Sequence, residues 1–303
     1  MPDPSVPLFL NPTAGRGRAG KRLSRIEQLF SEHGVSVSAV RSRASGDIEA
    51  QVTEHINAGA RQVIVAGGDG SIHETVNGLL RASTGASLGV IPSGTGNDFA
   101  KACNITLDWE QATRQLAERM AAGRPTRKID VGRMNDRYFA NSLGIGFEAK
   151  VTRVARAYQW PIGDLVYLLA ILRCLADGVA TPELSIVIDP DDAAPLWRGP
   201  VTFASVSNGA WVGGMFHMAP MALNADGELD LLIAAPVSRR RALALLPKLL
   251  RAAHMQEPEI SHHVVQKIIV TAATPVESHL DGEVQALQRK FDIEILPAAL
   301  DLL

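Results

Sequence analysis

One glycine-rich turn constrains the fold of this chain more than any other feature. Residues 63–66 are small or apolar, Gly67, Gly68 and Gly70 surround a single carboxylate, Asp69, and an amphipathic helical pattern follows. A buried strand, a tight turn and a helix form the unit from which parallel α/β sheets are built. Glycines bring bare N–H groups close to a ligand, and the helix N-terminus adds a partial positive charge, which suits phosphate. Because a bare carboxylate would repel phosphate, Asp69 indicates a metal-bound or proton-accepting group, and the turn favours phosphoryl transfer.

The pattern of predicted strands and helices divides the chain into two parts. Up to Pro125, strand and helix patterns alternate, which predicts a parallel sheet with crossover helices. The predicted strands cover 7–10, 35–40, 62–66 and 87–91, and the predicted helices cover 19–33, 47–57, 72–81 and 108–122. After Pro125, the strands come in hairpin-like runs with two helical inserts, which favours an antiparallel β-sandwich. These strands are predicted over 128–134, 137–142, 183–189, 201–207, 228–234, 264–272, 276–280 and 289–295, the inserts over 163–176 and 239–253, and a surface loop over 189–200.

We therefore expect two domains. Residues 1–125 would form an α/β nucleotide-binding domain, and residues 126–295 a β-sandwich substrate domain. The tail, 296–303, is apolar enough to pack on the first domain.

Composition excludes some classes of function. The net charge of −2 gives no argument for nucleic-acid binding, so we expect none. Cys103 and Cys174 show no metal-ligand spacing, and no basic region followed by an apolar run opens the chain, which favours a reduced, cytoplasmic protein. The most apolar run, 165–175, is too short to span a membrane, which takes about 20 residues. This run favours core packing over a membrane-docking face.

Two further glycine-rich turns follow predicted parallel strands. Residues 11–20 contain three glycines among basic residues, and in residues 92–100 Thr95 lies between Gly94 and Gly96, ahead of Asn97-Asp98. Carboxyl ends of parallel strands meet at one edge of a sheet, so the three turns would form a single nucleotide site.

Each of these turns also has a plainer interpretation. Residues 11–20 could be a solvated turn that opens a surface helix, and Asn97-Asp98 could cap a helix. Ser71 and Glu74 fit a capping box, which makes Glu74 structural. His73, in the first helical turn, could contact a ligand or lie exposed.

The second half holds two Asp-Gly turns. Asp226 opens a strand, where its carboxylate and nearby carbonyls would suit Mg²⁺, although a simple hairpin turn has the same pattern. Glu283 follows the second turn, and its spacing alone predicts a surface residue rather than a base. Residues 141–147 and 207–209 interrupt apolar strands with polar residues and glycines, which indicates backbone that lines a binding site.

Six segments in this order resemble one family. Residues 11–15, 67–78, 92–100, 141–147, 226–230 and 280–284 are similar to the bacterial diacylglycerol kinase and YegS-like lipid kinase family, which is related to sphingosine and ceramide kinases. The resemblance implies an α/β ATP-binding domain, a C-terminal β-sandwich and an active site in the cleft between them. Many members carry Thr where this chain has Ser71, which keeps the hydroxyl.

The resemblance also implies roles for individual residues. Those implied to bind ATP are Asn11, Pro12, Thr13, Ala14, Gly15, Ser42, Gly67, Gly68, Asp69, Gly70, Ser71, Ile72, His73 and Thr95, with Ser42 matched by position only. The implied Mg²⁺ site comprises Leu223, Asp226 and Glu228. The implied catalytic residues are Glu283, as general base, with Asp69 and Asp98.

The resulting hypothesis is a lipid kinase. A lipid hydroxyl would attack the γ-phosphoryl group of ATP at a membrane surface, with Glu283 or Asp69 accepting the proton. The same Gly-Gly-Asp-Gly turn occurs in NAD kinases and phosphofructokinases, so a kinase of a soluble substrate is the alternative enzyme. A non-catalytic lipid-binding protein of kinase descent is the alternative of another class. The lipid itself and the oligomeric state are not predicted.

Overall fold

The computed structural model describes residues 5–12, 14–158, 163, 165–188 and 194–303. These residues form two compact units, one reaching to Ile129 and joined by Ala298–Leu303, the other comprising Asp130–Pro297. The first unit is a parallel α/β structure and the second an antiparallel β-sandwich, which confirms the predicted fold class.

The first unit is built on a parallel sheet. Its strands lie in the order β2 (Val37–Arg41), β1 (Val6–Leu10), β3 (Gln62–Gly67) and β4 (Ser87–Pro92). The end of β16 (Gln288–Leu302) adds to the far edge, where Asp301 and Leu302 run parallel to Ser87 and Leu88 of β4. The helices are α1 (Ala14–Glu32), α2 (Asp47–Asn57), α3 (Asp69–Arg81), α4 (Asp98–Ala102) and α5 (Trp109–Ala121).

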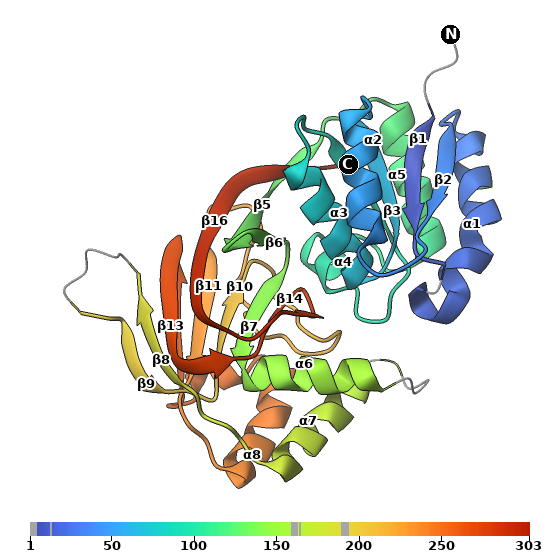
Figure 1. Cartoon of the computed structure of the whole chain (residues 1–303). Coiled ribbons are helices and arrows are strands. Elements are labelled where there is room, and N and C mark those ends of the chain that lie inside the picture. Colours follow the sequence, from blue (N-terminus) through green and yellow to red (C-terminus); the bar gives the residue numbers. More distant parts are fainter. Residues whose placement is uncertain (1–4, 13, 159–162, 164, 189–193) are drawn as a thin grey trace. The chain divides into compact units, whose positions relative to one another are not determined.

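Alternating side chains of the sheet are covered on both faces. Leu8 and Leu10 pack with Ile26 of α1 and Leu116 of α5. Phe9, between them in sequence, points to the other face, where its ring meets that of His55 on α2 edge to face. α2 and α3 pack together on that second face (Figure 1). Burial on both faces explains why the strands of this sheet are continuous apolar runs.

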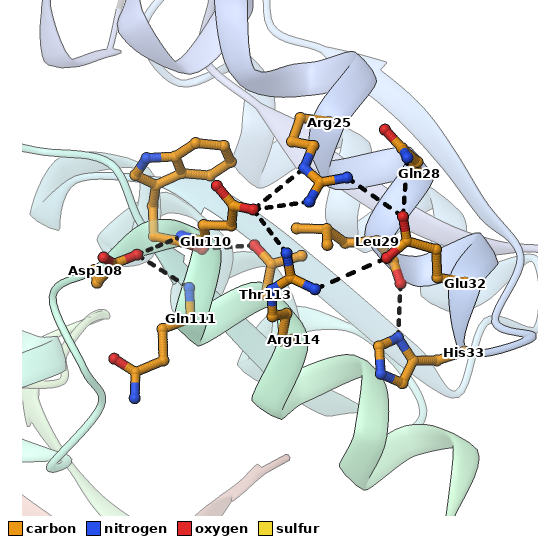
Figure 2. A network of polar contacts seen from close by, with 11 residues as sticks. Arg25, Gln28, Leu29, Glu32, His33, Asp108, Glu110, Gln111, Thr113 and Arg114 are labelled. Carbon is orange, nitrogen blue, oxygen red and sulfur yellow. Dashed lines mark hydrogen bonds and ion pairs between the residues drawn. The ribbon is translucent and has the colours of Figure 1, made fainter.

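Ion pairs link α1 to α5 at the surface. Figure 2 shows Glu110 accepting hydrogen bonds from Arg25 (2.9 Å) and Arg114 (2.8 Å), while Arg25 also reaches Glu32 (3.3 Å). The hydrogen bonds from Arg25 and Arg114 lower the pKa of Glu110. Exposed pairs of this kind contribute little individually, so the buried side chains between the two helices carry most of the packing energy.

The second unit consists of two antiparallel sheets. One has the order β12 (Ile260–Val265), β11 (Leu229–Ala234), β10 (Phe203–Ser207), β7 (Ser142–Gly146), β14 (Ser278–Leu280) and β15 (Glu283–Val284). The other contains the first part of β16, β13 (Lys267–Val276), β8 (Glu183–Val187) and β9 (Trp197–Pro200), with β5 (Arg127–Met134) and β6 (Arg137–Phe139) as a hairpin beside β16. Ile145 and Leu231 of the first sheet pack against Val270 and Phe291 of the second, which forms the core of the sandwich.

Three helices gather at one end of the sandwich, α6 (Phe147–Ala157), α7 (Leu165–Asp177) and α8 (Arg239–Leu250), with the 3-10 turn η1 (His254–Gln256) following α8 (Figure 1). Ile171 and Cys174 of α7 are buried against α6, so one face of this apolar run packs in the core, while Leu165 and Leu172 are exposed. No helix in the described part of the chain is both long enough and apolar enough to cross a bilayer.

Several predicted elements are wrong in their limits. The strand predicted over 137–142 ends at Phe139, because the N–H groups of residues 140–142 donate to Asp281 instead of to a neighbouring strand. The strand predicted over 264–272 changes sheets at Gln266, and that over 276–280 changes at Glu277.

The remaining differences between predicted and observed elements also concern where strands and helices begin and end. The strand predicted over 201–207 begins only at Phe203, because residues 197–200 form β9 of the other sheet. The loop predicted over 189–200 therefore ends in a strand, and residues 189–193 lie outside the described residues. Helix α1 begins at Ala14 rather than at residue 19, and α6 was not predicted.

Candidate active site

The turn after β3 lies against the turn after β4. Ser93 N–H donates to the carbonyl of Gly67 (2.8 Å), and a Cβ added to Gly68 would lie 2.9 Å from the Cα of Gly94. Gly68 has an extended backbone (φ −98°), so its lack of a side chain is required by this close approach rather than by its φ angle. The glycines of the two turns therefore bring two stretches of backbone into direct contact.

The third turn is closed by its own amide side chain. Asn97 Oδ1 accepts from Gly94 N–H (2.9 Å), and its Nδ2 donates to the Gly94 carbonyl (3.2 Å). The interpretation of Asn97 as a helix-capping side chain is wrong, because the residue adopts φ 51° and its amide points back into the turn. Thr95 stands exposed at the tip.

Asp69 and Asp98 meet around this turn. Asp69 begins α3, and its Oδ1 accepts from the backbone N–H of Phe99 (3.3 Å). Asp98 begins α4, is buried, and lies 3.6 Å from Lys101 Nζ. The structure thus brings both predicted carboxylates of the first unit to the same pair of turns.

The start of α3 differs from its predicted form. The capping box is wrong, since Gly68 is the N-cap residue and Glu74 instead accepts from the N–H groups of Gly46 (2.8 Å) and Ile48 (3.0 Å) at the start of α2. Glu74 is structural, as predicted, but it serves another helix. His73 is buried, and Asn77 lies beside it on α3, so the exposed alternative for His73 is wrong.

The first glycine-rich turn is shorter than predicted. β1 ends at Leu10, Asn11 and Pro12 are half-buried, and α1 begins at Ala14, so Gly15 lies in its first turn. Thr13 lies outside the described residues. Ser42, just beyond β2, donates its N–H to the carbonyl of Leu10 (2.9 Å), which places it next to this turn.

In the second unit, the predicted metal residues lie on the turn before β11. Leu223, Asp226 and Glu228 are exposed, and Asp226 Oδ1 accepts from Glu228 N–H (3.1 Å). Asp130 holds the turn, with its Oδ2 accepting from Gly227 N–H (2.7 Å). Sequence reasoning missed Asp130, although a carboxylate between two buried apolar residues of a strand is a recognisable signal.

The donors on this turn fit Mg²⁺ in kind. They are carboxylate and carbonyl oxygens, which are the ligands that hard divalent cations prefer. No cluster of three acidic, histidine or cysteine side chains suited to a metal occurs among the described residues, so one carboxylate with carbonyls and water is the arrangement available. Nearby, burial raises the pKa of Asp230, and a hydrogen bond with His262 (2.6 Å) opposes that shift.

The second Asp-Gly turn is held from two sides. Asp281, with φ 50°, accepts N–H groups from Ala140 (3.0 Å), Asn141 (2.8 Å) and Ser142 (3.0 Å). Glu283 is half-buried and lies 2.5 Å from Arg156 of α6. The turn that carries Glu283 is thus fixed both by the sandwich and by α6.

Comparison with known proteins places these features in one family. Residues 5–134 match the diacylglycerol kinase catalytic domain, and residues 141–303 match the YegS C-terminal NAD kinase beta sandwich-like domain. A diacylglycerol kinase of Bacillus subtilis (strain 168) is 30% identical over 91% of this chain and 88% of its own length. The chain belongs to the diacylglycerol kinase and YegS-like lipid kinase family. It is therefore an enzyme of the phosphotransferase class.

Two further relatives extend the comparison. A protein of Pectobacterium atrosepticum named "Probable lipid kinase YegS-like" is 31% identical to this lipid kinase over 84% of this chain and 82% of its own. The crystal structure of a diacylglycerol kinase from Bacillus anthracis strain Sterne superimposes with a TM-score of 0.77 at 23% identity, covering 98% of this chain and 96% of that one. The latter likeness concerns the fold.

This lipid kinase also contains an apolar cavity that sequence reasoning did not identify. It has a volume of about 120 Å³ and lies within the second unit, where α6, α7 and α8 cover the sheet. Its walls include Val151 of α6, Ile171 of α7, Leu246 of α8 and Phe203 of β10. The apolar run over 165–175 was the available signal, but its exposed and buried faces cannot be separated without the neighbouring helices.

Proposed function

We propose that this kinase transfers the γ-phosphoryl group of ATP to a hydroxyl group of a membrane lipid, in a reaction that requires Mg²⁺. The observation that carries the lipid acceptor is the cavity of the second unit, because its lining is almost entirely apolar. A soluble acceptor such as a sugar phosphate or a nucleotide would gain nothing from such a surface, whereas an acyl chain gains about 25 cal/mol for each Å² removed from water.

The first unit supplies the nucleotide-binding groups in this proposal. Backbone N–H groups of residues 67–73 and of Asn11, Ala14 and Gly15 would hold the phosphates, with Ser42 and Thr95 completing the nucleotide site. At Gly68 and Gly94 themselves, where the two backbones touch, no Cβ stands between the turns and a phosphate. Asp98 would keep the third turn in place through Lys101.

Leu223, Asp226 and Glu228 would hold Mg²⁺, the first and last through their carbonyl oxygens. When bound, Mg²⁺ supplies positive charge that offsets the charge of the phosphates.

Glu283 would accept the proton of the lipid hydroxyl. A base for this step must lie within hydrogen-bond reach of the hydroxyl, and Glu283 is held on a fixed turn where its half-buried carboxylate is paired with Arg156. Asp69 is the alternative base; in its other role it would orient the phosphates through the turn it shares with Phe99.

In this proposal the enzyme acts at a membrane surface. Leu172 of α7 and Leu243 of α8 are more than 40% exposed, and the two helices pack together. α8 opens with Arg239 and Arg240, and each basic side chain near an anionic bilayer contributes about 1 kcal/mol of attraction. Peripheral binding through this face would bring lipid close to the helices that cover the cavity.

The test is a phosphorylation assay with γ-labelled ATP and Mg²⁺. Vesicles containing diacylglycerol, phosphatidylglycerol or a sphingoid base are compared with NAD and sugar phosphates as acceptors. We expect label in the lipid fraction, its loss on chelation of the metal, and a fall of about 10²–10⁴ in rate for Glu283→Gln or Asp69→Asn. Glu118→Gln, an exposed carboxylate of α5, serves as the control and should keep full activity. Label confined to soluble products would show that the lipid acceptor is wrong.

A further inference from the structure

The apolar cavity of the second unit contains two polar atoms that lack partners among the described residues. These are Oε2 of Glu148, on the first turn of α6, and Nδ1 of His254, in η1. Both side chains line the cavity, and both are more than nine-tenths buried. Buried polar atoms are almost always paired, so two orphans in one otherwise apolar cavity indicate a ligand that pairs them.

The hydrogen bonds around Glu148 define what Oε2 can do. His279 Nδ1 lies 3.3 Å from the backbone N of Gly282, and because a backbone N–H can only donate, Nδ1 carries the lone pair. The proton of this ring is then on Nε2, which donates to Glu148 Oε1 (3.1 Å). One carboxylate oxygen is satisfied, and Oε2 remains an acceptor with no partner among the described residues, beside the apolar lining of the cavity.

The second atom without a partner, Nδ1 of His254, is also an acceptor. His254 Nε2 lies 2.8 Å from the carbonyl oxygen of Met218, so Nε2 donates and Nδ1 keeps its lone pair. Burial lowers the pKa of His254, which keeps the ring neutral. Neither polar atom can therefore pair with a ligand carbonyl, but each can accept from a hydroxyl or an amide N–H.

We propose that this cavity binds the apolar part of a ligand that carries hydrogen-bond donors, and that Glu148 Oε2 and His254 Nδ1 accept from a hydroxyl or amide N–H group of that ligand. The proposal rests on the proposed function to the extent that the ligand is the lipid acceptor. A lipid whose chains are joined only by esters, and whose one hydroxyl is the phosphoryl acceptor itself, brings only carbonyl oxygens to the cavity and would leave both atoms unpaired. The cavity would thus select amide-linked or hydroxylated lipids over plain diesters.

Glu148→Gln gives a sharp test because His279 fixes the orientation of the new amide. His279 Nε2–H donates to Oε1 of Glu148, so in the variant the amide oxygen must take the place of Oε1. The amide NH₂ then takes the place of Oε2. The variant keeps the hydrogen bond to His279 and changes the atom facing the cavity from an acceptor to a donor. His254→Phe, on a different element, removes the second acceptor. It keeps the proposal testable if Glu148→Gln fails to fold.

The experiment measures equilibrium binding of two lipids in detergent micelles, without ATP. One is an N-acyl amino alcohol, and the other is the ester that has an oxygen in place of its amide N–H, with the same chains and the same hydroxyl group. We expect the wild type to bind the amide about tenfold more tightly, the amount that one hydrogen bond of about 1.4 kcal/mol represents. Glu148→Gln should abolish or reverse this ratio, and His254→Phe should reduce it. Leu246→Met, a change of apolar lining with similar volume, should leave the ratio as it is. Equal wild-type affinities, or an unchanged ratio in Glu148→Gln, would overturn the proposal, as would failure of either lipid to bind.

Phosphorylation of the same two lipids separates this inference from the proposed function. Amide preference in binding without phosphorylation of any lipid means that the proposed function fails while the cavity assignment holds. Equal phosphorylation of both lipids, with equal binding, means that the kinase function holds and the donor selectivity fails.

Discussion

At the scale of single residues, contacts between backbones determine which substitutions the turns after β3 and β4 can accept. Gly68 has a φ angle open to any residue, yet its position opposite Gly94 leaves no room for a methyl group. Gly85, in the same unit, has no atom within 4 Å of an added Cβ. Comparing an alanine substitution at Gly68 with one at Gly85 thus separates the effect of the close backbone contact from the general effect of replacing a glycine.

We predict that Gly68→Ala raises KM for ATP about tenfold or more, because the two turns must separate to admit the new Cβ and the N–H groups proposed to bind the phosphates move with them. Stability should fall by about 1–3 kcal/mol. Steady-state kinetics over a range of ATP concentrations and urea unfolding give both values. Gly85→Ala should change neither, and an unaltered KM in Gly68→Ala would mean that this pair of turns does not bind the nucleotide.

Sequence reasoning found the glycines and missed the groups that act through distant contacts. Gly67 and Asp69 stand in a turn whose local pattern carries the signal, whereas the role of Glu283 was implied only by the family resemblance. Glu148 and His279 are 131 residues apart and meet only because β7 and β14 are neighbours in one sheet. No local spacing predicts such a pair, since it depends on strand order.

At the scale of elements, the ends of strands were harder to predict than their existence. Apolar residues recur on both sides of Gln266, yet Val265 pairs with β11 in one sheet and Ile268 with β16 in the other. The polar pair Gln266-Lys267 shifts the buried positions by one residue, and both segments bury one face in the same core, so a single strand was predicted where the chain changes sheets. The helix α6 did leave a signal, because Phe147, Val151 and Ala155 recur at helical spacing after Gly146, whose φ is 88°.

Helix α8 is held to its surroundings by ion pairs as well as by partial burial, since none of its described residues is fully buried. Arg241 donates to Glu259 (2.7 Å) and to Glu257 (2.5 Å), and Lys248 also pairs with Glu257. The hydrogen bonds from Arg241 lower the pKa of Glu259 from 4.5 to about 2.

This network predicts an acid-sensitive contribution to the stability of the second unit. A carboxyl group whose pKa is lower in the folded state stabilises the fold fully above its unfolded pKa, and that stabilisation is lost as the pH falls from about 4.5 toward about 2. Arg241→Met should therefore be less stable than the wild type at pH 7, and the difference should shrink as the pH is lowered through this window. Urea unfolding from pH 7 to pH 3 measures it, with Arg240→Met as the control on the same helix. A difference that is constant with pH would show that packing of the Arg241 stem, rather than its charge, is responsible.

At the scale of the whole molecule, the chain returns to its first unit at the end. Ala298–Leu303 belongs with residues up to Ile129, and Leu303 N–H donates to the carbonyl of Leu88 (2.9 Å). Leu300 and Leu302 are each 2% exposed, so the last strand contributes buried side chains to a unit whose other residues all precede Asp130. Contacts this distant in sequence form late and at a high cost in loop-closure entropy, which makes the unit dependent on a segment that follows the entire second unit.

We predict that Leu302→Ala destabilises the first unit selectively, by about 2–4 kcal/mol, because it leaves a cavity beside β4 that the parallel sheet cannot close. Hydrogen exchange followed by mass spectrometry resolves this, since peptides from β3 and β4 should exchange faster while peptides from β10 and β11 keep their wild-type protection. Leu287→Ala, at a position that is 62% exposed, should leave both sets unchanged. Equal acceleration in the two units would mean that they unfold as one cooperative body, and the selectivity argued here would be wrong. If the selectivity holds, kinase activity in Leu302→Ala should fall together with protection of β3, because the Gly67 turn begins where that strand ends.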